Sequence, residues 1–261
     1  MSKRVRIKKY NLILNAIYDS GEFLMEGLNK KRTFSMKQRQ HYLTKFDLQI
    51  DKKIVDSIKK SFPQDNIWSE EGGFKKGSNN YTWYIDPLSN TRNYIHGLPG
   101  FSIAIGLAKE GEPVLGFVYD PWLKELFTGE TGKGAELNGE PIKVSRFKFG
   151  EHAFINVDWQ KRKTIKEINE GIGLFTKTGK YCTVRAIGSV ALMACYVASG
   201  RLDAMLNNYS DFHALIPASI IVREAGGEIL DLSGKKWTLN SVSTFVTNKV
   251  VTKKILECLK K

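Results

Sequence analysis

The sequence predicts a layered α/β fold of the α+β kind, in which an antiparallel sheet precedes a half that alternates strands and helices. Three observations predict it. The first 60 residues carry helical patterns of apolar residues. Residues 101–127 hold short apolar runs separated by Gly, Pro and Asp turns, which is typical of antiparallel strands. From about residue 150, strand and helix patterns alternate.

The N-terminal half predicts two helices followed by a sheet. Apolar residues recur every four positions from Phe46 to Phe62, and Pro63 ends this second helix. Residues 82–88 predict a short strand that runs into Asp86-Pro87, a pair that leaves the helical region of the backbone. Apolar runs at 101–108, 114–119 and 126–127 continue the sheet, and this half is expected to end at residue 148.

The C-terminal half, residues 149–261, predicts four strands and four helices. The strands are expected at residues 153–157, 181–185, 202–206 and 244–246, and the helices at 160–175, 189–199, 216–225 and 250–260. Neither an internal repeat nor a linker separates the two halves. We therefore expect 1–148 and 149–261 to form one compact structural unit.

The composition is that of a globular protein. Apolar residues make up 42% and charged residues 26% of the 261 positions, which excludes a fibrous or disordered chain. No apolar run reaches the roughly 18–20 residues that a membrane helix needs, and no secretory signal pattern is found, so a cytoplasmic protein is expected. The three widely spaced cysteines, Cys182, Cys195 and Cys258, form neither a disulfide framework nor a zinc pattern.

The chain is strongly basic, with a formal net charge of +13. This charge favours anionic partners such as phosphorylated metabolites, nucleic acid or acidic proteins. The Lys and Arg residues are spread along the whole chain, and no nucleic-acid-binding motif accompanies them. A solvated Lys-rich surface explains the charge as well, so nucleic-acid binding remains the less favoured alternative.

Acidic residues are placed where they could meet around a cation. Asp47 lies on the second helix, Glu70 in a turn, Asp86 at a strand end and Asp211 before a helix. Magnesium prefers carboxylate, carbonyl and water oxygens, so such residues can converge on it. Acidic turn residues are also ordinary surface features, and their spacing alone leaves both interpretations open.

The local sequence around Asp86 favours the metal site. Residues 83–94 are Trp-Tyr-Ile-Asp-Pro-Leu-Ser-Asn-Thr-Arg-Asn-Tyr, which resembles the inositol monophosphatase signature Asp-Pro-(Ile/Leu)-Asp-Gly-Thr-x-Asn-(Phe/Tyr). Other family stretches are matched in order, at Leu43-Thr44 with Asp47 and Asp51, at Ser69-Glu70-Glu71, at 132–145, at 188–192, at 200–204 and at 224–227. The resemblance extends from about residue 10 to residue 250.

The resemblance implies a five-layered αβαβα sandwich, usually a homodimer, that hydrolyses small phosphate monoesters with magnesium. In the family, metal ions clamp the phosphate and activate the attacking water. The resemblance assigns one metal to Glu70, Asp86 and the Leu88 carbonyl. It assigns catalysis to Glu70 together with Asp47 and Thr91, which orient the water.

The resemblance fails at the second metal. The family's second signature aspartate is Ser89 here, and the next position, a family glycine, is Asn90. Counting from both flanking motifs places the family's later aspartate at Ala214. The substrate positions implied are Asn90, Thr91 and Asn207, where Asn207 replaces a family glutamate that contacts a substrate hydroxyl.

Two residues near position 214 are possible substitutes. Asp211 lies three residues early, which would rotate it away by most of a turn if the segment were helical. His213 occupies the family's tryptophan position, and either a ligand or a space-filling role fits it. Asp211 therefore enters as a possible substitute metal ligand, and Ser89 and Ala214 as degenerate metal positions.

The number of carboxylates that remain indicates how many metal ions this site can hold. Four family carboxylates balance two divalent ions, whereas Glu70 and Asp86 alone suit one well-held magnesium ion. We therefore expect a weakened phosphatase of sugar or inositol phosphates. The alternative is an inactive family member that binds a phosphorylated ligand or an acidic or nucleic-acid partner.

Overall fold

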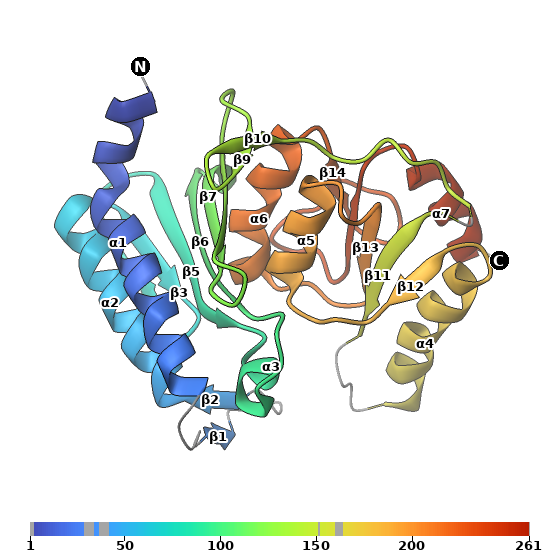
Figure 1. Cartoon of the computed structure of the whole chain (residues 1–261), viewed down its shortest axis with the longest axis horizontal. Helices are drawn as coiled ribbons and strands as arrows, with labels where there is room; N and C mark the ends of the chain where they lie inside the picture. Colours follow the sequence, from blue (N-terminus) through green and yellow to red (C-terminus); the bar gives the residue numbers. More distant parts are fainter. Residues whose placement is uncertain (1–2, 29–33, 37–41, 151, 160–163, 261) are drawn as a thin grey trace.

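The computed structural model describes residues 3–28, 34–36, 42–150, 152–159 and 164–260. The elements form five layers in the order αβαβα (Figure 1). Helices α1 (Lys3–Leu28) and α2 (Lys45–Ser61) form one outer layer, and α4 (Ile165–Gly179) and α7 (Thr252–Lys260) form the other. Helices α5 (Val190–Ala198) and α6 (Phe212–Glu224) lie between the two sheets. The predicted layered fold is confirmed.

The first sheet has eight strands in the order β10-β9-β8-β7-β6-β5-β3-β4. Its strands are β3 (Asn66–Ser69), β4 (Gly73–Lys75), β5 (Tyr81–Ser89), β6 (Ser102–Lys109), β7 (Glu112–Asp120), β8 (Glu125–Glu130), β9 (Ala135–Leu137) and β10 (Glu140–Ile142). All neighbours are antiparallel except β3 and β5, which run parallel. A separate pair, β1 (Phe34–Met36) and β2 (Tyr42–Thr44), precedes α2.

The second sheet has five strands in the order β12-β11-β13-β15-β14. These are β11 (Phe154–Asp158), β12 (Thr183–Arg185), β13 (Ala204–Asn207), β14 (Glu228–Leu230) and β15 (Thr244–Thr247). Strand β11 runs parallel to both β12 and β13, and β15 is antiparallel to its neighbours. The carboxyl ends of β11 and β13 therefore lie at the same edge of the sheet.

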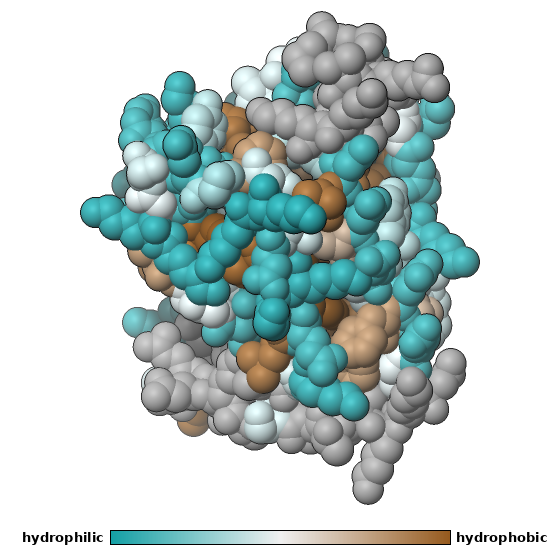
Figure 2. All heavy atoms as spheres, turned by 90° about the vertical axis from the view of Figure 1, so that its left-hand side faces the viewer, coloured by the Kyte–Doolittle hydropathy of each residue, from teal (hydrophilic) through white to brown (hydrophobic). Residues whose placement is uncertain are grey.

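Helix α2 forms where the periodic pattern predicts it. Thr44 begins the helix with a capping box, since its side chain accepts from the Asp47 amide while the Asp47 carboxylate receives the Thr44 backbone amide. The repeated apolar residues from Phe46 to Ile58 are all buried against the sheet and α1. Figure 2 shows the outer face of this layer, where most visible side chains are hydrophilic.

Helix α6 packs unusually close to the first sheet. A side-chain carbon added at Gly116 would lie 2.0 Å from the Pro217 carbonyl oxygen, and one at Gly106 would lie 2.7 Å from the Pro217 nitrogen. Such contacts are shorter than atoms allow, so only glycine fits at these strand positions. The two glycines let the middle helix layer rest directly on the strand backbone.

Two helices were predicted with wrong boundaries. The helix expected at 216–225 begins one turn earlier, at Phe212, because Asp211 caps it and Pro217 lies inside it rather than at its start. The helix expected at 160–175 is α4, which begins after the capping residue Thr164 and continues to Gly179. Residues 160–163 lie outside the described part of the chain.

Within the described ranges, no helix combines the length and apolar character that crossing a bilayer requires. Cys182, Cys195 and Cys258 are buried free thiols. Burial raises the pKa of Cys182 to about 11, so this thiol stays protonated and unreactive at neutral pH.

Candidate active site

Asp86 is a buried carboxylate whose pKa is influenced by other acidic side chains. Its side chain is 2% exposed, and its Oδ1 atom has no hydrogen-bond partner. Burial raises the pKa of Asp86 well above its usual range, and the negative charges of Glu70, Asp211 and Asp47 raise it further. A hydrogen bond from the Ser89 side chain lowers the pKa of Asp86.

The chain turns sharply between Asp86 and the start of α3. The pairing of β5 with β6 is irregular between Asp86 and Ser89, and the strand ends there. Asn90 then adopts a left-handed backbone with φ of 64° before α3 (Thr91–His96) begins. Asn is one of the few residues that tolerate this conformation, which explains how it replaces the family's glycine. The side-chain amide nitrogen of Asn90 donates to the Gly100 carbonyl oxygen at 2.8 Å.

Thr91 and Asp47 are brought together from elements far apart in sequence. The Thr91 hydroxyl lies 3.2 Å from Asp47 Oδ1 and 3.0 Å from the Leu88 carbonyl oxygen. The other oxygen of Asp47 receives the Thr44 backbone amide at 2.7 Å and the Thr44 hydroxyl. Asp47 is thus held in one orientation by the helix cap, with an oxygen directed at Thr91.

Asp211 lies close enough to Asp86 to raise the pKa of Asp86, whereas the Ala214 side chain has no oxygen. Asp211 has an extended backbone and caps α6, with Oδ1 accepting the amides of His213 at 3.1 Å and Ala214 at 3.4 Å. Because Asp211 precedes the helix, the helical rotation expected to turn it away does not apply. Ala214 lies in the first turn of α6 and is fully buried in the central apolar cluster.

A second polar group lies at the carboxyl ends of β11 and β13. Asn207 is 1% exposed, and both polar atoms of its side chain lack hydrogen-bond partners. It pairs in register with Asp158, whose pKa is raised because burial outweighs the hydrogen bonds from the Trp159 and Gly188 amides and the charge of Arg92. Arg92 belongs to α3, so this edge of the second sheet faces the turn and helix that follow Asp86.

Asp158 and its neighbour Asn156 were missed by the sequence analysis. Both are polar residues in the otherwise apolar run 154–158, and that alternation is the signal that could have found them. Asn156 accepts the Ile187 amide at 3.0 Å, and Ile187 in turn accepts a hydrogen bond from Asn93 of α3. The segment containing Ile187 therefore joins the second sheet to α3.

The donor set around Asp86 fits a hard divalent cation. Asp86 Oδ1 is buried, has no hydrogen-bond partner and lies near other carboxylates. The ionised form of such a carboxylate is stable only with positive charge nearby. In the described part of the chain, however, no three His, Cys, Asp or Glu side chains lie together as a complete ligand set. Magnesium is commonly bound by one or two carboxylates with carbonyl and water oxygens, so Glu70, Asp86 and the Leu88 carbonyl suit it.

Comparisons with known proteins find relatives that match most of the chain. The chain is 34% identical over 236 residues to a fructose-1,6-bisphosphatase/inositol-1-monophosphatase of Thermotoga maritima, covering 87% of this chain and 84% of the relative. It is 32% identical to the Nus factor SuhB of Pseudomonas aeruginosa, covering 86% and 85%.

The fold also matches solved structures. An IMPase of Thermotoga maritima superimposes with a TM-score of 0.87 at 30% identity, covering 99% of this chain and 97% of that one. The sequence model of the inositol monophosphatase family matches residues 9–261, which include every residue of the site described above. The chain therefore belongs to the inositol monophosphatase family.

Proposed function

We propose that this protein is a magnesium-dependent phosphatase of small phosphate monoesters, with sugar or inositol phosphates as substrates. The observation that carries the proposal is Asp86, a buried carboxylate with an unpartnered oxygen beside Glu70, Asp211 and Asp47. A divalent cation would remove the repulsion within this group. A family relative named as a fructose-1,6-bisphosphatase/inositol-1-monophosphatase supports the same substrate class.

Glu70, Asp86 and the Leu88 carbonyl would hold the ion, which when bound lowers the pKa of water and neutralises charge on the phosphate and leaving oxygen. The hydroxyl of Thr91 has one proton, and it donates this proton to Asp47 or to the Leu88 carbonyl. The Thr91 oxygen then keeps lone pairs that accept a hydrogen bond from the attacking water. Asp47, fixed by Thr44, orients that hydroxyl.

The second metal position is reduced in this chain. Ser89 offers a neutral hydroxyl that already hydrogen-bonds to Asp86, and Ala214 offers a buried methyl group. We propose that Asp211 supplies the missing carboxylate from its capping position, one turn before Ala214. A second ion would then share Asp86 and bind more weakly than the first, which lowers the rate.

The experiment is phosphate release from inositol 1-phosphate and fructose 1,6-bisphosphate with saturating magnesium. The native chain should release phosphate, and Asp86→Asn should lower the rate by about a thousandfold or more, since several kcal/mol of charge stabilisation are lost. Asp120→Asn, a change at the buried aspartate that ends β7, is the matched control and should keep the rate. No release by the native chain, or full release by Asp86→Asn, would contradict the proposal.

A second candidate function is binding of an anionic macromolecule, with catalysis weak or lost. The net charge of +13 favours it, and the 32% identical relative named Nus factor SuhB is consistent with a role other than metabolite hydrolysis. Retention on immobilised RNA that falls steeply between 50 and 200 mM salt, as roughly expected for several phosphate contacts, would support this candidate. Absent or salt-insensitive retention would count against it.

A further inference from the structure

The connection between the two sheets meets the start of α7 at the surface of the molecule. In Figure 1 this connection runs from β10 past α7 on its way to β11. Asn248 fixes the meeting point, since its side-chain nitrogen donates to the Phe147 carbonyl oxygen at 3.3 Å and its side-chain oxygen accepts the Val250 amide at 2.9 Å. Segments 143–150 and 248–253 are therefore held side by side.

Phe147 lies on the exposed part of the first segment. The residues before it point inward, because Val144 packs against the central apolar cluster and the Ser145 hydroxyl donates to the buried Asp203 carboxylate. Residues 146–148 are exposed, and 60% of the Phe147 surface is open to solvent. An exposed aromatic ring of this kind is available to a planar partner.

Four exposed cations belong to the same two segments, namely Arg146, Lys148, Lys249 and Lys253. Within the described ranges of the chain, none of the four forms an ion pair. Segments 143–150 and 248–253 also contain no Asp or Glu. We call Phe147 and these four residues the basic patch.

Carboxylates on neighbouring elements do not cancel the charge of the basic patch. Asp203 is 3% exposed and accepts a hydrogen bond from the Asn248 side chain. Glu228 of β14 is half-buried and accepts the Thr252 hydroxyl at 2.7 Å. Glu257 of α7 is already paired with a lysine outside the patch. Two negative charges thus face four positive ones, and the patch keeps a positive charge.

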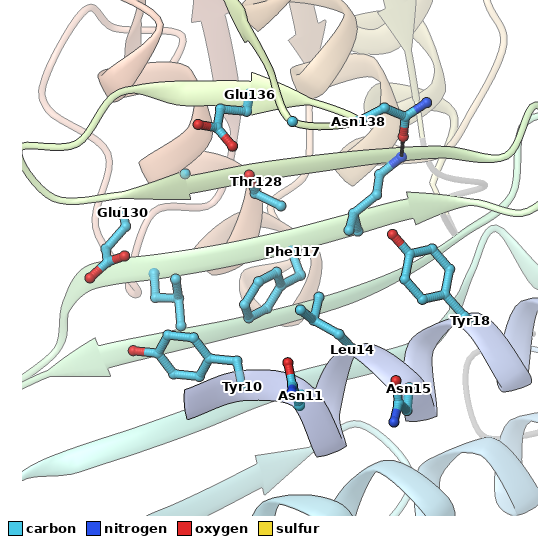
Figure 3. Close-up of a pocket in the computed structure, with 14 residues that line it drawn as sticks. Tyr10, Asn11, Leu14, Asn15, Tyr18, Phe117, Thr128, Glu130, Glu136 and Asn138 are labelled. Atoms are coloured by element: carbon cyan, nitrogen blue, oxygen red, sulfur yellow. Dashed lines mark hydrogen bonds between the residues drawn. The ribbon is translucent and has the colours of Figure 1, made fainter. Parts of the chain in front are cut away.

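The cavity beside α1, shown in Figure 3, lacks this character. Its described lining residues include Glu130 and Glu136 but neither lysine nor arginine, although the chain has 40 of these basic residues. An anionic partner is therefore attracted to the basic patch rather than to that cavity.

We propose that the basic patch binds single-stranded nucleic acid, with a base stacked on Phe147 and backbone phosphates at the four cations. An exposed aromatic ring directly flanked by Arg146 and Lys148 is a combination that suits single strands. An acidic peptide would need the cations but not the ring, and a duplex keeps its bases stacked internally. The proposal rests on the second candidate function above and names its partner and its surface; phosphate release does not enter.

The test is a titration of the full chain with a fluorescent single-stranded RNA of about 12 nucleotides, followed by anisotropy in EDTA so that no metal bridges the phosphates. With four phosphate contacts, a plot of log affinity against log salt should have a slope of about −3, at roughly −0.7 per contact. A duplex of the same sequence should bind more weakly at each salt concentration. Duplex binding as tight as that of the single strand would overturn the proposal.

Phe147→Ala tests the stacked base. It should weaken RNA binding about fivefold or more and leave the salt slope unchanged, because stacking releases no counterions. Phe74→Ala is the matched control, since Phe74 on β4 is also 55% exposed, and it should leave the affinity unchanged. Heparin, a polyanion without bases, should bind Phe147→Ala as it binds the native chain. An equal loss of heparin and RNA binding in Phe147→Ala would overturn base stacking.

Arg146→Gln combined with Lys148→Gln tests the charges. This pair should reduce the slope from about −3 to about −1.5, whereas Lys59→Gln with Lys60→Gln, an equal loss of charge at exposed positions of α2, should not change it. RNA binding that is unchanged in the patch variants contradicts this surface and leaves the second candidate function standing. Absence of RNA binding by the native chain contradicts both.

Discussion

In the absence of a cation, the ionised form of Asp86 has a cost in stability. Its folded-state pKa lies above that of an unfolded chain, so the folded protein binds a proton more tightly than the unfolded one. The free energy of unfolding of the metal-free protein therefore falls as pH rises from about 4, near the ordinary pKa of Asp, to the raised pKa of Asp86. A bound cation reverses this loss by favouring the ionised form.

The variant Asp86→Asn should therefore be more stable than the native protein at neutral pH when no metal is present. An asparagine amide has no charge to repel, and it can donate to the neighbouring carboxylates of Glu70 and Asp211. Thermal unfolding should show a rise of a few degrees, since about 1 kcal/mol corresponds to roughly 2–4 °C in a chain of this size. The rise should vanish near pH 4. A lower melting temperature at neutral pH would show that Asp86 is not under electrostatic strain.

Asp211 caps α6, and we propose that it is also a metal ligand; substitution can separate the two roles. Serine is as good a helix cap as aspartate, so Asp211→Ser should keep the stability of α6 while removing the charge near Asp86. Asp211→Ala should lose both, with a stability cost of about 1 kcal/mol. We expect both variants to lose the second, more weakly bound metal ion when manganese is used as the probe. We also expect the rate of phosphate release to fall about tenfold or more. Native binding and activity in Asp211→Ser would show that Asp211 is only a cap.

At the scale of elements, the close packing of α6 on the first sheet positions Asp211. A methyl group at Gly116 would collide with the backbone of Pro217, which a flexible side chain cannot relieve. Gly116→Ala should therefore cost about 1–3 kcal/mol or more in chemical denaturation, and it should also displace the start of α6. Metal binding should weaken with it.

Gly173 provides the control for this change. It lies in α4 with no atom near the position of an added methyl group. Gly173→Ala should leave metal binding unchanged and stabilise the protein by about 0.5–1 kcal/mol, because alanine is the better helix former. Similar effects of the two substitutions would contradict the packing account of α6.

Local signals explain which elements the sequence could predict. Helix α2 and strand β5 carry their own patterns, a four-residue apolar period ended by Pro63 and an apolar run ending at Asp86-Pro87. The start of α6 was predicted one turn late. Asp211 is itself a local N-cap signal, and the apolar turn that follows it is buried between the two sheets.

The site was predicted in part. The resemblance to the family's motifs indicated Asp47, Glu70, Asp86 and Thr91, and the structure places Thr91 against Asp47. The repulsion between Asp211 and Asp86 depends on how α6 meets the first sheet, and the basic patch depends on a contact between residues 101 positions apart. Neither leaves a pattern in one stretch of sequence.

At the scale of the whole molecule, metal binding should stabilise the chain beyond its effect on catalysis. A ligand that binds only the folded state adds about 2.7 kcal/mol at a concentration one hundred times its dissociation constant. Magnesium should therefore raise the melting temperature of the native protein and leave that of Asp86→Asn unchanged. An equal rise in both proteins would indicate general ionic effects on a chain of charge +13 rather than a specific site.

Manganese binding, followed by electron paramagnetic resonance of the free ion, tests the Asp86 centre most directly. We predict one tightly bound ion per native chain, a second that binds more weakly, and loss of the tight ion in Asp86→Asn. Two equally tight ions in the native chain would contradict the reduced second site, and a tight ion that persists in Asp86→Asn would contradict the centre itself.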